Sequence, residues 1–345
     1  MGNIVDHISS AAGVERLDKG SSRGMFSGIW KKREPDEIEA YFSVGTPTTT
    51  PDLKEIDTRW PQPWAFWKAF IGAILAFGGL YYMASHFQML QVMPALLMVG
   101  AFAVPCSVLV LFFEFNVSRN FSLYQLLRLS LLGGVISLVT CLFFGGWASG
   151  LGLDWMGASV AGVVEEPAKL LAMLIVAKNL RYRWTHNGLL IGACVGTGFA
   201  VVETAGYAFV AMFSDMANGE AATEGTLFQR AVLYPLGGHA LLSAVVGAGL
   251  WRVKGEKPFD WSMLKDGRFL RLLIIAATLH AIWNAPVELP YLGKYLCIGF
   301  VLWLIILSLV QAGLKEIRAA QATMDTQGHS YETEATHSDT PVQTA

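Results

Sequence analysis

The feature of this sequence that most constrains its fold is a set of long stretches without a single charged residue. Three of them run from Val92 to Phe113, from Leu129 to Trp147 and from Tyr295 to Leu314. Each is close to the roughly 20 residues that a helix needs to cross about 30 Å of hydrocarbon. Only 15% of the 345 residues are charged and 53% are hydrophobic, whereas a soluble domain contains about 25% charged residues. The sequence therefore predicts an all-α polytopic membrane protein.

The apolar stretches together predict a bundle of about eight transmembrane helices, which forms a membrane-embedded core over residues 64–314. We expect the spans at 64–84, 92–113, 127–147, 155–178, 188–213, 229–251, 270–287 and 293–314. Residues 1–63 precede the first span and are expected to form a partly disordered arm. Residues 315–345 form a tail rich in Thr, Ser, Gln and acidic residues. Because such a segment cannot bury enough apolar surface to fold, we expect it to be disordered.

Positive charge alternates between the loops that connect the predicted spans. Lys and Arg are frequent at 178–183 and 252–268, and they are absent from 85–91 and 148–154. An excess of Lys and Arg marks the cytoplasmic loops of membrane proteins. The alternation therefore predicts that both termini lie in the cytoplasm and that the lipid bilayer is a partner of the chain. The formal net charge of −2 gives no reason to expect a nucleic acid.

Ionisable and amide side chains interrupt four of the predicted spans near their middles. An ionisable side chain at the centre of a membrane helix costs at least about 2.5–3.5 kcal/mol, so such residues are rare and usually functional. The fourth to seventh spans contain a set of them, namely Glu165, Glu166, Lys169, Glu203, His239, His280 and Asn284. The other four spans have nothing comparable in their middles.

These polar residues share a depth in the membrane. Glu166, Glu203, His239 and His280 each lie about eight to ten residues from the expected outer end of their span, which is about 12–15 Å at 1.5 Å per residue. Four helices of alternating direction thus bring two acids and two imidazoles to one level. Lys169 lies one helical turn after Glu166, and we expect it to neutralise this carboxylate or its neighbour.

Two catalytic chemistries fit this set, and the sequence leaves both open. In the first, a buried carboxylate activates water as general base, while an imidazole or Asn284 stabilises the oxyanion of a tetrahedral intermediate. In the second, His239, His280 and Glu203 bind Zn²⁺ and leave one coordination position open for water. The sequence contains no HExxH motif, so the zinc alternative depends on composition and depth alone.

Four short motifs on successive spans are those of a known family. Glu165-Glu166-Pro167-Ala168-Lys169 has the pattern EExxK, the stretch from Phe199 to Glu203 has the pattern FxxxE, and the stretch from His280 to Asn284 has the pattern HxxxN, with His239 before it. In these motifs and in helix number, residues 64–314 resemble the PrsW-type intramembrane proteases. That family is distantly similar to the CAAX-processing and bacteriocin-processing membrane proteases.

The resemblance implies hydrolysis of a peptide bond in a membrane protein or peptide substrate, with an anti-sigma factor as one candidate. It also implies the inner membrane of a bacterial cell as the location. The residues that it implies as catalytic are Glu165, Glu166, Glu203, His239 and His280, supported by Lys169, Asn284 and Phe199. Which of the two histidines is the principal catalytic one stays open.

Two other functions would use the same residues. A proton- or cation-coupled transporter would bind ions with the buried Glu and His side chains, although we find neither a strong internal repeat nor a clearly broken helix in the sequence. An inactive membrane scaffold would use them only for packing. The histidines of the expected loops, His86 and His186, are predicted to be solvated.

Overall fold

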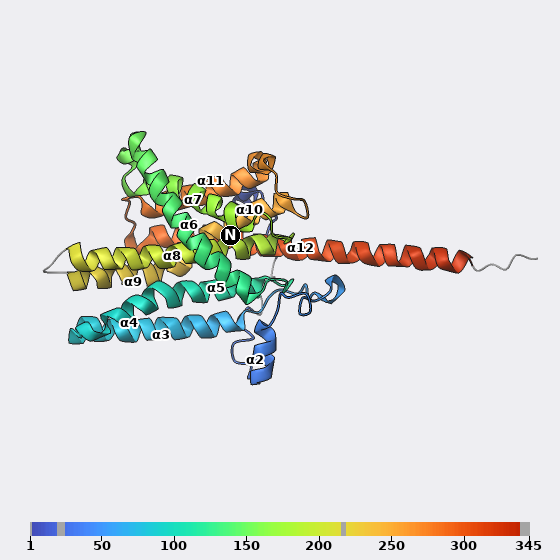
Figure 1. Ribbon diagram of the computed structural model, residues 1–345, viewed down its shortest axis with the longest axis horizontal. Coiled ribbons are helices and arrows are strands. Elements are labelled where there is room, and N and C mark those ends of the chain that lie inside the picture. The colour runs from blue at the N-terminus through green and yellow to red at the C-terminus, as the bar shows by residue number, and fades with distance from the viewer. Residues whose placement is uncertain (1, 19–24, 215–218, 339–345) are drawn as a thin grey trace, which may run out of the picture.

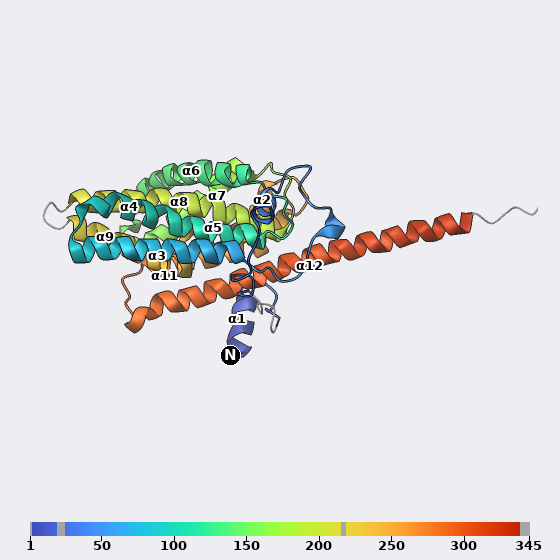
Figure 2. The ribbon, with the colours of Figure 1, turned by 90° about the horizontal axis from the view of Figure 1, so that it is seen from below.

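The computed structural model describes residues 2–18, 25–214 and 219–338, which form a bundle of long helices without a β-strand (Figures 1 and 2). The core contains the helices α3 (Trp64–Phe87), α4 (Met93–Met98), α5 (Val104–Phe115), α6 (Leu123–Gly150), α7 (Val160–Ala177), α8 (Thr185–Ser214), α9 (Gly219–Gly237), α10 (His239–Lys254), α11 (Gly267–Asn284) and α12 (Gly293–Ser338). Several of them run nearly parallel, whereas α6 crosses α8 obliquely.

Six helical segments of the described residues are long and apolar enough to cross a membrane. They comprise α3, α4 with α5, α6, α8, α9 with α10, and α12. The two other predicted spans coincide with α7 and α11. These two helices are more polar, because α7 contains Glu165, Glu166 and Lys169, and α11 contains Arg268 and Arg271. The all-α polytopic fold is thus confirmed, and the number of eight spans stays a prediction.

The sixth predicted span is broken in the middle. Between α9 and α10, Gly238 has an extended backbone with φ −65° and ψ 164°. Pro235, in the last turn of α9, has no N–H to donate, and the glycines that follow it are weak helix formers. The expectation that no helix is clearly broken is therefore wrong for this helix. As a result, His239 is the first residue of α10.

The central helix α8 lies very close to α10 because its contact face consists of glycines. A Cβ atom at Gly196 would lie 2.3 Å from the His239 carbonyl oxygen, and one at Gly192 would lie 2.0 Å from that of Ser243. Small residues allow membrane helices to approach this closely. The glycine face of α8 thus fixes the position of α10, and with it the backbone of His239.

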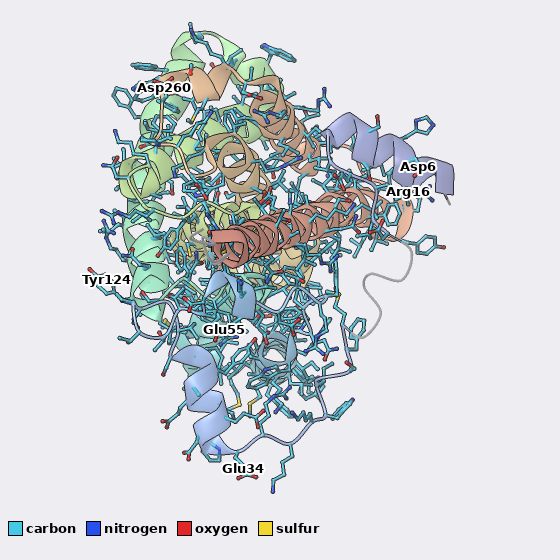
Figure 3. The ribbon with its side chains drawn as sticks, turned by 90° about the vertical axis from the view of Figure 1, so that its right-hand side faces the viewer. Asp6, Arg16, Glu34, Glu55, Tyr124 and Asp260 are labelled. Carbon is cyan, nitrogen blue, oxygen red and sulfur yellow. The ribbon has the colours of Figure 1, made fainter. Side chains whose placement is uncertain are left out.

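The N-terminal arm lies on the end of the bundle from which α12 extends, here called the arm end (Figure 3). It contains α1 (Gly2–Ala12), α2 (Pro35–Phe42) and a short 3₁₀ helix, η1 (Leu53–Glu55). Gln311 of α12 donates to the Arg16 carbonyl at 2.8 Å and accepts from the Asp18 N–H at 2.7 Å. These bonds tie the arm to α12, and the partial disorder of the arm stays a prediction.

A buried carboxylate at the arm end caps the first membrane helix. Glu114, near the end of α5, accepts hydrogen bonds from the backbone N–H groups of Trp64, Ala65 and Phe66 at 2.7 to 3.1 Å. The first N–H groups of a helix have no partner within the helix, and they favour a negative charge. Glu114 therefore fixes the start of α3 against the end of α5.

The last helix continues past the predicted end of its span. α12 is helical through Ser338 and extends away from the bundle (Figure 2). The disorder expected for residues 315–345 stays a prediction, and residues 339–345 lie outside the described residues.

One histidine of the expected loops is not solvated. His186 lies in the first turn of α8, is only 1% exposed, and donates from Nε2 to the Val310 carbonyl of α12 at 2.9 Å. Its prediction was wrong because α8 begins at Thr185, before the predicted start of the span, and α12 covers it. His86 is exposed, as predicted.

Candidate active site

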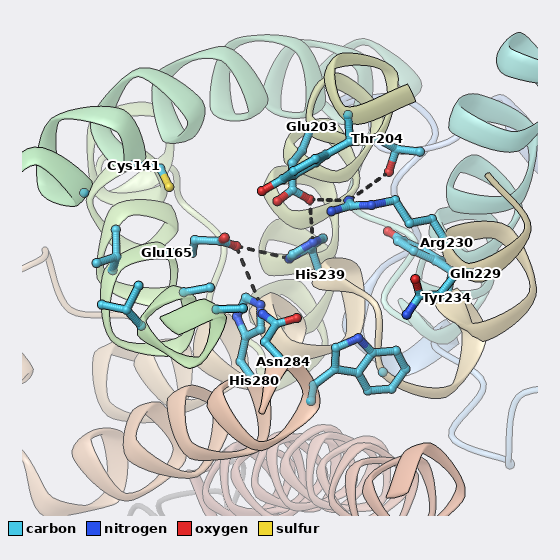
Figure 4. Close-up of a pocket in the computed structure, with 18 of the residues that line it drawn as sticks. Cys141, Glu165, Glu203, Thr204, Gln229, Arg230, Tyr234, His239, His280 and Asn284 are labelled. Carbon is cyan, nitrogen blue, oxygen red and sulfur yellow. Dashed lines mark hydrogen bonds and ion pairs between the residues drawn. The ribbon is translucent and has the colours of Figure 1, made fainter. Parts of the chain in front are cut away.

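Polar side chains from four helices meet inside the bundle (Figure 4). They are Glu165, Glu166 and Lys169 of α7, Glu203 of α8, His239 of α10 and His280 of α11. Each has a charged atom or ring nitrogen within 4 Å of another member of the cluster. The structure thus brings together the acids and imidazoles that the sequence placed at one depth.

On the inner side of the cluster, His280 is held by Glu166. The Oε1 atom of Glu166 accepts from Lys169 Nζ at 2.6 Å and from His280 Nδ1 at 2.8 Å, and all three side chains are buried. Because an ionised carboxylate can only accept, Nδ1 of His280 has the proton. A neutral His280 therefore presents the lone pair of Nε2 toward Glu165, whose Oε2 atom is 3.7 Å away.

On the cavity side, His239 is held in the same way by Glu203. Its Nε2 atom lies 2.8 Å from Glu203 Oε2, and Arg230 of α9 donates to the same oxygen at 2.7 Å. A neutral His239 with its proton on Nε2 has the free lone pair on Nδ1. This Nδ1 atom lies 3.6 Å from Glu165 Oε2 and 3.2 Å from Lys169 Nζ.

Glu165 is the residue on which both imidazoles converge. Its Oε2 atom is buried and has no hydrogen-bond partner among the described residues. One ligand atom each of Glu165, His239 and His280 lies within 4.8 Å of the others, so the three could hold a metal ion. Two imidazole lone pairs and a carboxylate oxygen that face one point attract a cation, and Lys169 Nζ lies 3.2 Å from one of these nitrogens and 3.8 Å from the oxygen. Two histidines and one carboxylate are also a frequent ligand set of catalytic zinc.

The surroundings of these three residues also fit a divalent cation. A metal-ligating histidine almost always donates its other ring N–H to a carboxylate, a carbonyl or water, and Glu166 and Glu203 supply such carboxylates here. When ionised, three glutamates face the two cations Lys169 and Arg230, which leaves a net charge of −1 with neutral imidazoles. A metal ion would compete with Lys169 for Nδ1 of His239. If the ion displaced Lys169 from this nitrogen, Lys169 would keep its hydrogen bond to Glu166.

A cavity of about 590 Å³ lies beside the cluster. Four members of the cluster line it, together with side chains of α6, α8, α9 and α11 such as Cys141, Tyr207, Arg230 and Asn284. A water molecule occupies about 30 Å³ in the liquid, so the cavity has room for a short peptide segment beside water. Lys169 and Glu166 are fully buried behind it.

Two predicted supporting residues lie where they can contribute, and one predicted ligand lies differently. The ring of Phe199 packs against His239 with 5.0 Å between centroids and lies 5.0 Å from Lys169 Nζ. Asn284 lines the cavity. Glu203, expected beside both imidazoles as a metal ligand, bonds the ring nitrogen of His239 that points away from Glu165. The role of Glu203 as a metal ligand stays a prediction.

Sequence reasoning missed Arg230, which lies between Glu203 and the ring of Tyr207. Its NH1 atom also donates to Thr204 Oγ1 at 3.3 Å, and its guanidinium lies 4.3 Å from the Tyr207 ring centroid. A signal was present, because Arg230 is the one cation within the predicted sixth span, at an end expected to be outside. A positive charge there breaks the alternation of the loops.

Comparison with known proteins supports the motifs quoted above. The model of the PrsW family, described as intramembrane metalloproteases, matches residues 90–310. This region reaches from the start of α4 into α12 and contains every member of the cluster as well as Arg230. No curated protein and no solved structure matches the chain.

Proposed function

Since the chain belongs to the PrsW family of intramembrane metalloproteases, we propose that it hydrolyses a peptide bond of a membrane-associated protein in the cavity beside Glu165. One observation supports this site above all. Nδ1 of His239 and Nε2 of His280 converge on Oε2 of Glu165, which has no hydrogen-bond partner among the described residues, while Glu203 and Glu166 hold the opposite nitrogens. Such an arrangement suits a hydrolytic metal centre.

In this proposal, Glu165, His239 and His280 hold the metal through Oε2, Nδ1 and Nε2. Two imidazoles and one carboxylate favour Zn²⁺ among the common biological cations. When bound, such an ion polarises the scissile carbonyl and makes a water molecule more acidic.

The other residues of the cluster orient and neutralise these three. Glu166 and Glu203 fix the ring orientation and tautomer of the histidines, which raises the basicity of the free nitrogens. Lys169 Nζ lies 3.8 Å from Glu165 Oε2 and 2.6 Å from Glu166 Oε1, so from behind the cavity its charge offsets that of the two carboxylates. Asn284, at the cavity wall, supplies a donor for the oxyanion of a tetrahedral intermediate.

We further propose that the chain lies in the inner membrane of a bacterial cell with both termini in the cytoplasm, and that it cuts its substrate in the outer half of the bilayer. The loop 148–154 is poor in Lys and Arg, which places it on the outer side of the membrane in this proposal. Ala158 and Val160, shortly after this loop, line the cavity, so the cavity would lie in the outer half of the bilayer. A single-span protein such as an anti-sigma factor would present its scissile bond at that level.

The test is cleavage of a single-span substrate by the purified chain in liposomes, with the products identified by mass spectrometry. We expect cleavage by the wild type and at least a 100-fold slower rate for Glu165→Gln and for His239→Ala, because each removes a reacting group. His86→Ala is the matched control, since His86 is exposed and remote from the cavity, and it should cleave as the wild type does.

The same preparation separates the two rival functions. A proton or cation flux across the liposome membrane without any cleavage product would favour the transporter. The break between α9 and α10 makes this control necessary, because broken helices are frequent in transporters. Neither flux nor cleavage with any membrane substrate tested would favour the inactive scaffold.

A further inference from the structure

A second cavity, of about 370 Å³, lies at the arm end of the bundle. The arm forms one side of it, and the first residues of α3 and the last residues of α5 form the other. Trp64 and Glu114, which line it, stand at the ends of two apolar membrane spans. The cavity therefore lies at the edge of the hydrophobic belt, where the headgroups of the lipids begin.

The acidic residues of this cavity already have partners. Glu114 accepts from the first N–H groups of α3 and from the hydroxyl of Tyr41 at 3.0 Å. Asp57 accepts three hydrogen bonds from the guanidinium of Arg59, and a carboxylate oxygen of Glu37 lies 3.7 Å from Lys31 Nζ. Asp57 and Glu37 are thus paired with cations, and Glu114 is bound by neutral N–H and O–H donors.

Two arginines of the same lining have no such partner. Neither Arg33 nor Arg119 has a carboxylate oxygen within 4.0 Å among the described residues. Arg33 lies over the ring of Trp64 at 4.2 Å, and Arg119 lies over the ring of Tyr41 at 4.3 Å. The lining thus contains two guanidinium groups without a direct carboxylate partner, each lying over an aromatic ring, which is a frequent arrangement for arginine.

Two further features of the lining suit an anion with several acceptor oxygens. Arg119 has a left-handed backbone with φ 46°, which is uncommon for a residue other than glycine and is maintained only where its surroundings require it. The indole Nε1 of Trp60 is buried and has no hydrogen-bond partner among the described residues. An oxyanion such as a phosphate would accept hydrogen bonds from the guanidinium groups and from the indole N–H.

Exposed aromatic residues indicate that the anion belongs to a lipid. Phe26 and Trp30, in the arm, are 60% and 89% exposed, and the ring of Phe26 packs on that of Trp67 with 4.8 Å between centroids. Lys68 lies 5.2 Å above Trp64. Aromatic rings and cations at the end of a membrane helix are typical of contact with the headgroup layer.

We propose that Arg33 and Arg119 bind the phosphate of an anionic phospholipid headgroup in this cavity, and that the lipid fastens the arm to the bundle. The site is remote from the Glu165 cluster, so it does not depend on the proposed function. Lipid binding links the arm, α3 and α5 through one molecule that the membrane supplies.

Native mass spectrometry of the full-length chain, delipidated in detergent, tests the proposal. We expect the wild type to bind added phosphatidylglycerol, and its Arg33→Gln, Arg119→Gln double variant to bind it at least about tenfold more weakly, because two charges close to the headgroup are lost. Arg268→Gln is the matched control, since Arg268 pairs with Asp266 outside the cavity, and it should bind as the wild type does. Equal binding by the double variant would overturn the proposal.

Two further ligands identify what the cavity recognises. Diacylglycerol has the acyl chains without the phosphate, and inorganic phosphate has the anion without the chains, so both should bind much more weakly than phosphatidylglycerol. If diacylglycerol bound as tightly as phosphatidylglycerol, recognition of the phosphate would be excluded. If inorganic phosphate bound as tightly as phosphatidylglycerol, a lipid would be excluded as the preferred source of the phosphate.

Loss of folding is separated from loss of binding by a milder variant. Arg119 also donates to the Tyr41 carbonyl, so its removal can disturb the arm, whereas Arg33 bonds only carbonyls of its own loop. Arg33→Gln alone should keep the melting temperature of the delipidated chain and still bind phosphatidylglycerol about threefold or more weakly. Unchanged binding by this folded variant would contradict the proposal.

Discussion

The two histidines of the cluster are held by different sets of groups. His280 is buried against Glu166, which also accepts from the fully buried Lys169. His239 faces the cavity, and its carboxylate, Glu203, is shared with Arg230. His239 is thus the more accessible imidazole, and its orientation depends on a residue that lies outside the four motifs.

Arg230→Gln should lower kcat about 10- to 100-fold with little change in KM. The change removes the charge that holds Glu203 in place, and Glu203 then orients His239 less well. Steady-state cleavage kinetics measure the effect. Arg230→Lys should restore part of the rate, because it keeps a cation near Glu203, and no loss in either variant would mean that Arg230 does not position the site.

Metal affinity can distinguish the two candidate ligand sets. Glu165→Gln should abolish stoichiometric metal binding, because it removes a ligand oxygen. Glu203→Gln should weaken binding only about 10- to 100-fold, because Glu203 acts through His239. Elemental analysis and titration with Zn²⁺ would reveal the reverse order if Glu203, as the sequence predicted, were the ligand.

Among the helices, the contact between α8 and α10 sets the geometry of the site. Gly196 of α8 lies against the backbone of His239, and Glu203 follows two turns later on α8. The same pair of helices therefore provides both the histidine and the carboxylate that orients it. A shift of one helix along the other would separate them.

Gly196→Ala should destabilise the chain by about 1–3 kcal/mol, because the new methyl group would overlap the His239 carbonyl. Gly206→Ala on the same helix is the matched control. A Cβ atom there meets nothing within 4 Å, so this variant should be neutral or up to about 1 kcal/mol more stable. Reversible unfolding in detergent measures both, and equal stabilities would contradict the close contact.

The cap of α3 allows a second prediction for a helix. Glu114→Gln keeps an acceptor atom but loses the negative charge at three N–H groups, and it should lower the free energy of unfolding by about 1–2 kcal/mol. Glu39→Gln on the exposed face of α2 should change it by less than about 0.5 kcal/mol. The comparison uses the same unfolding experiment, and a loss no larger than that of Glu39→Gln would argue against the cap.

For the whole molecule, removal of the metal should stop proteolysis and leave the fold intact. Treatment with a chelator should abolish cleavage, and one equivalent of Zn²⁺ per chain should restore it, while the helical signal in circular dichroism stays constant. Full activity in the metal-free chain would favour the alternative in which a carboxylate alone activates water.

Much of this molecule follows from its sequence, because a bilayer permits few solutions. Long uncharged segments such as Val92 to Phe113 must be helices, and polar residues inside a membrane must meet one another. Equal depth predicted that Glu166, Glu203 and the two histidines meet, and the structure places these side chains together. Depth does not include the rotation of a side chain, so the sequence could not show that Glu203 bonds Nε2 of His239 while Glu165 faces Nδ1. Arg230 was missed since an arginine near a span end can also extend into the headgroup layer.

The interruption at Gly238 has a mechanical consequence. Arg230 and His239 are near neighbours in sequence, yet they belong to two separate helices, α9 and α10, which are joined by one extended residue. A partner that tilted α9 would move the guanidinium of Arg230 away from Glu203. The helix α10, which is packed against the glycines of α8, would be disturbed later. His239 would then be oriented less well by Glu203, while the other residues of the cluster kept their positions. The break at Gly238 therefore links the tilt of α9 to the activity of the site.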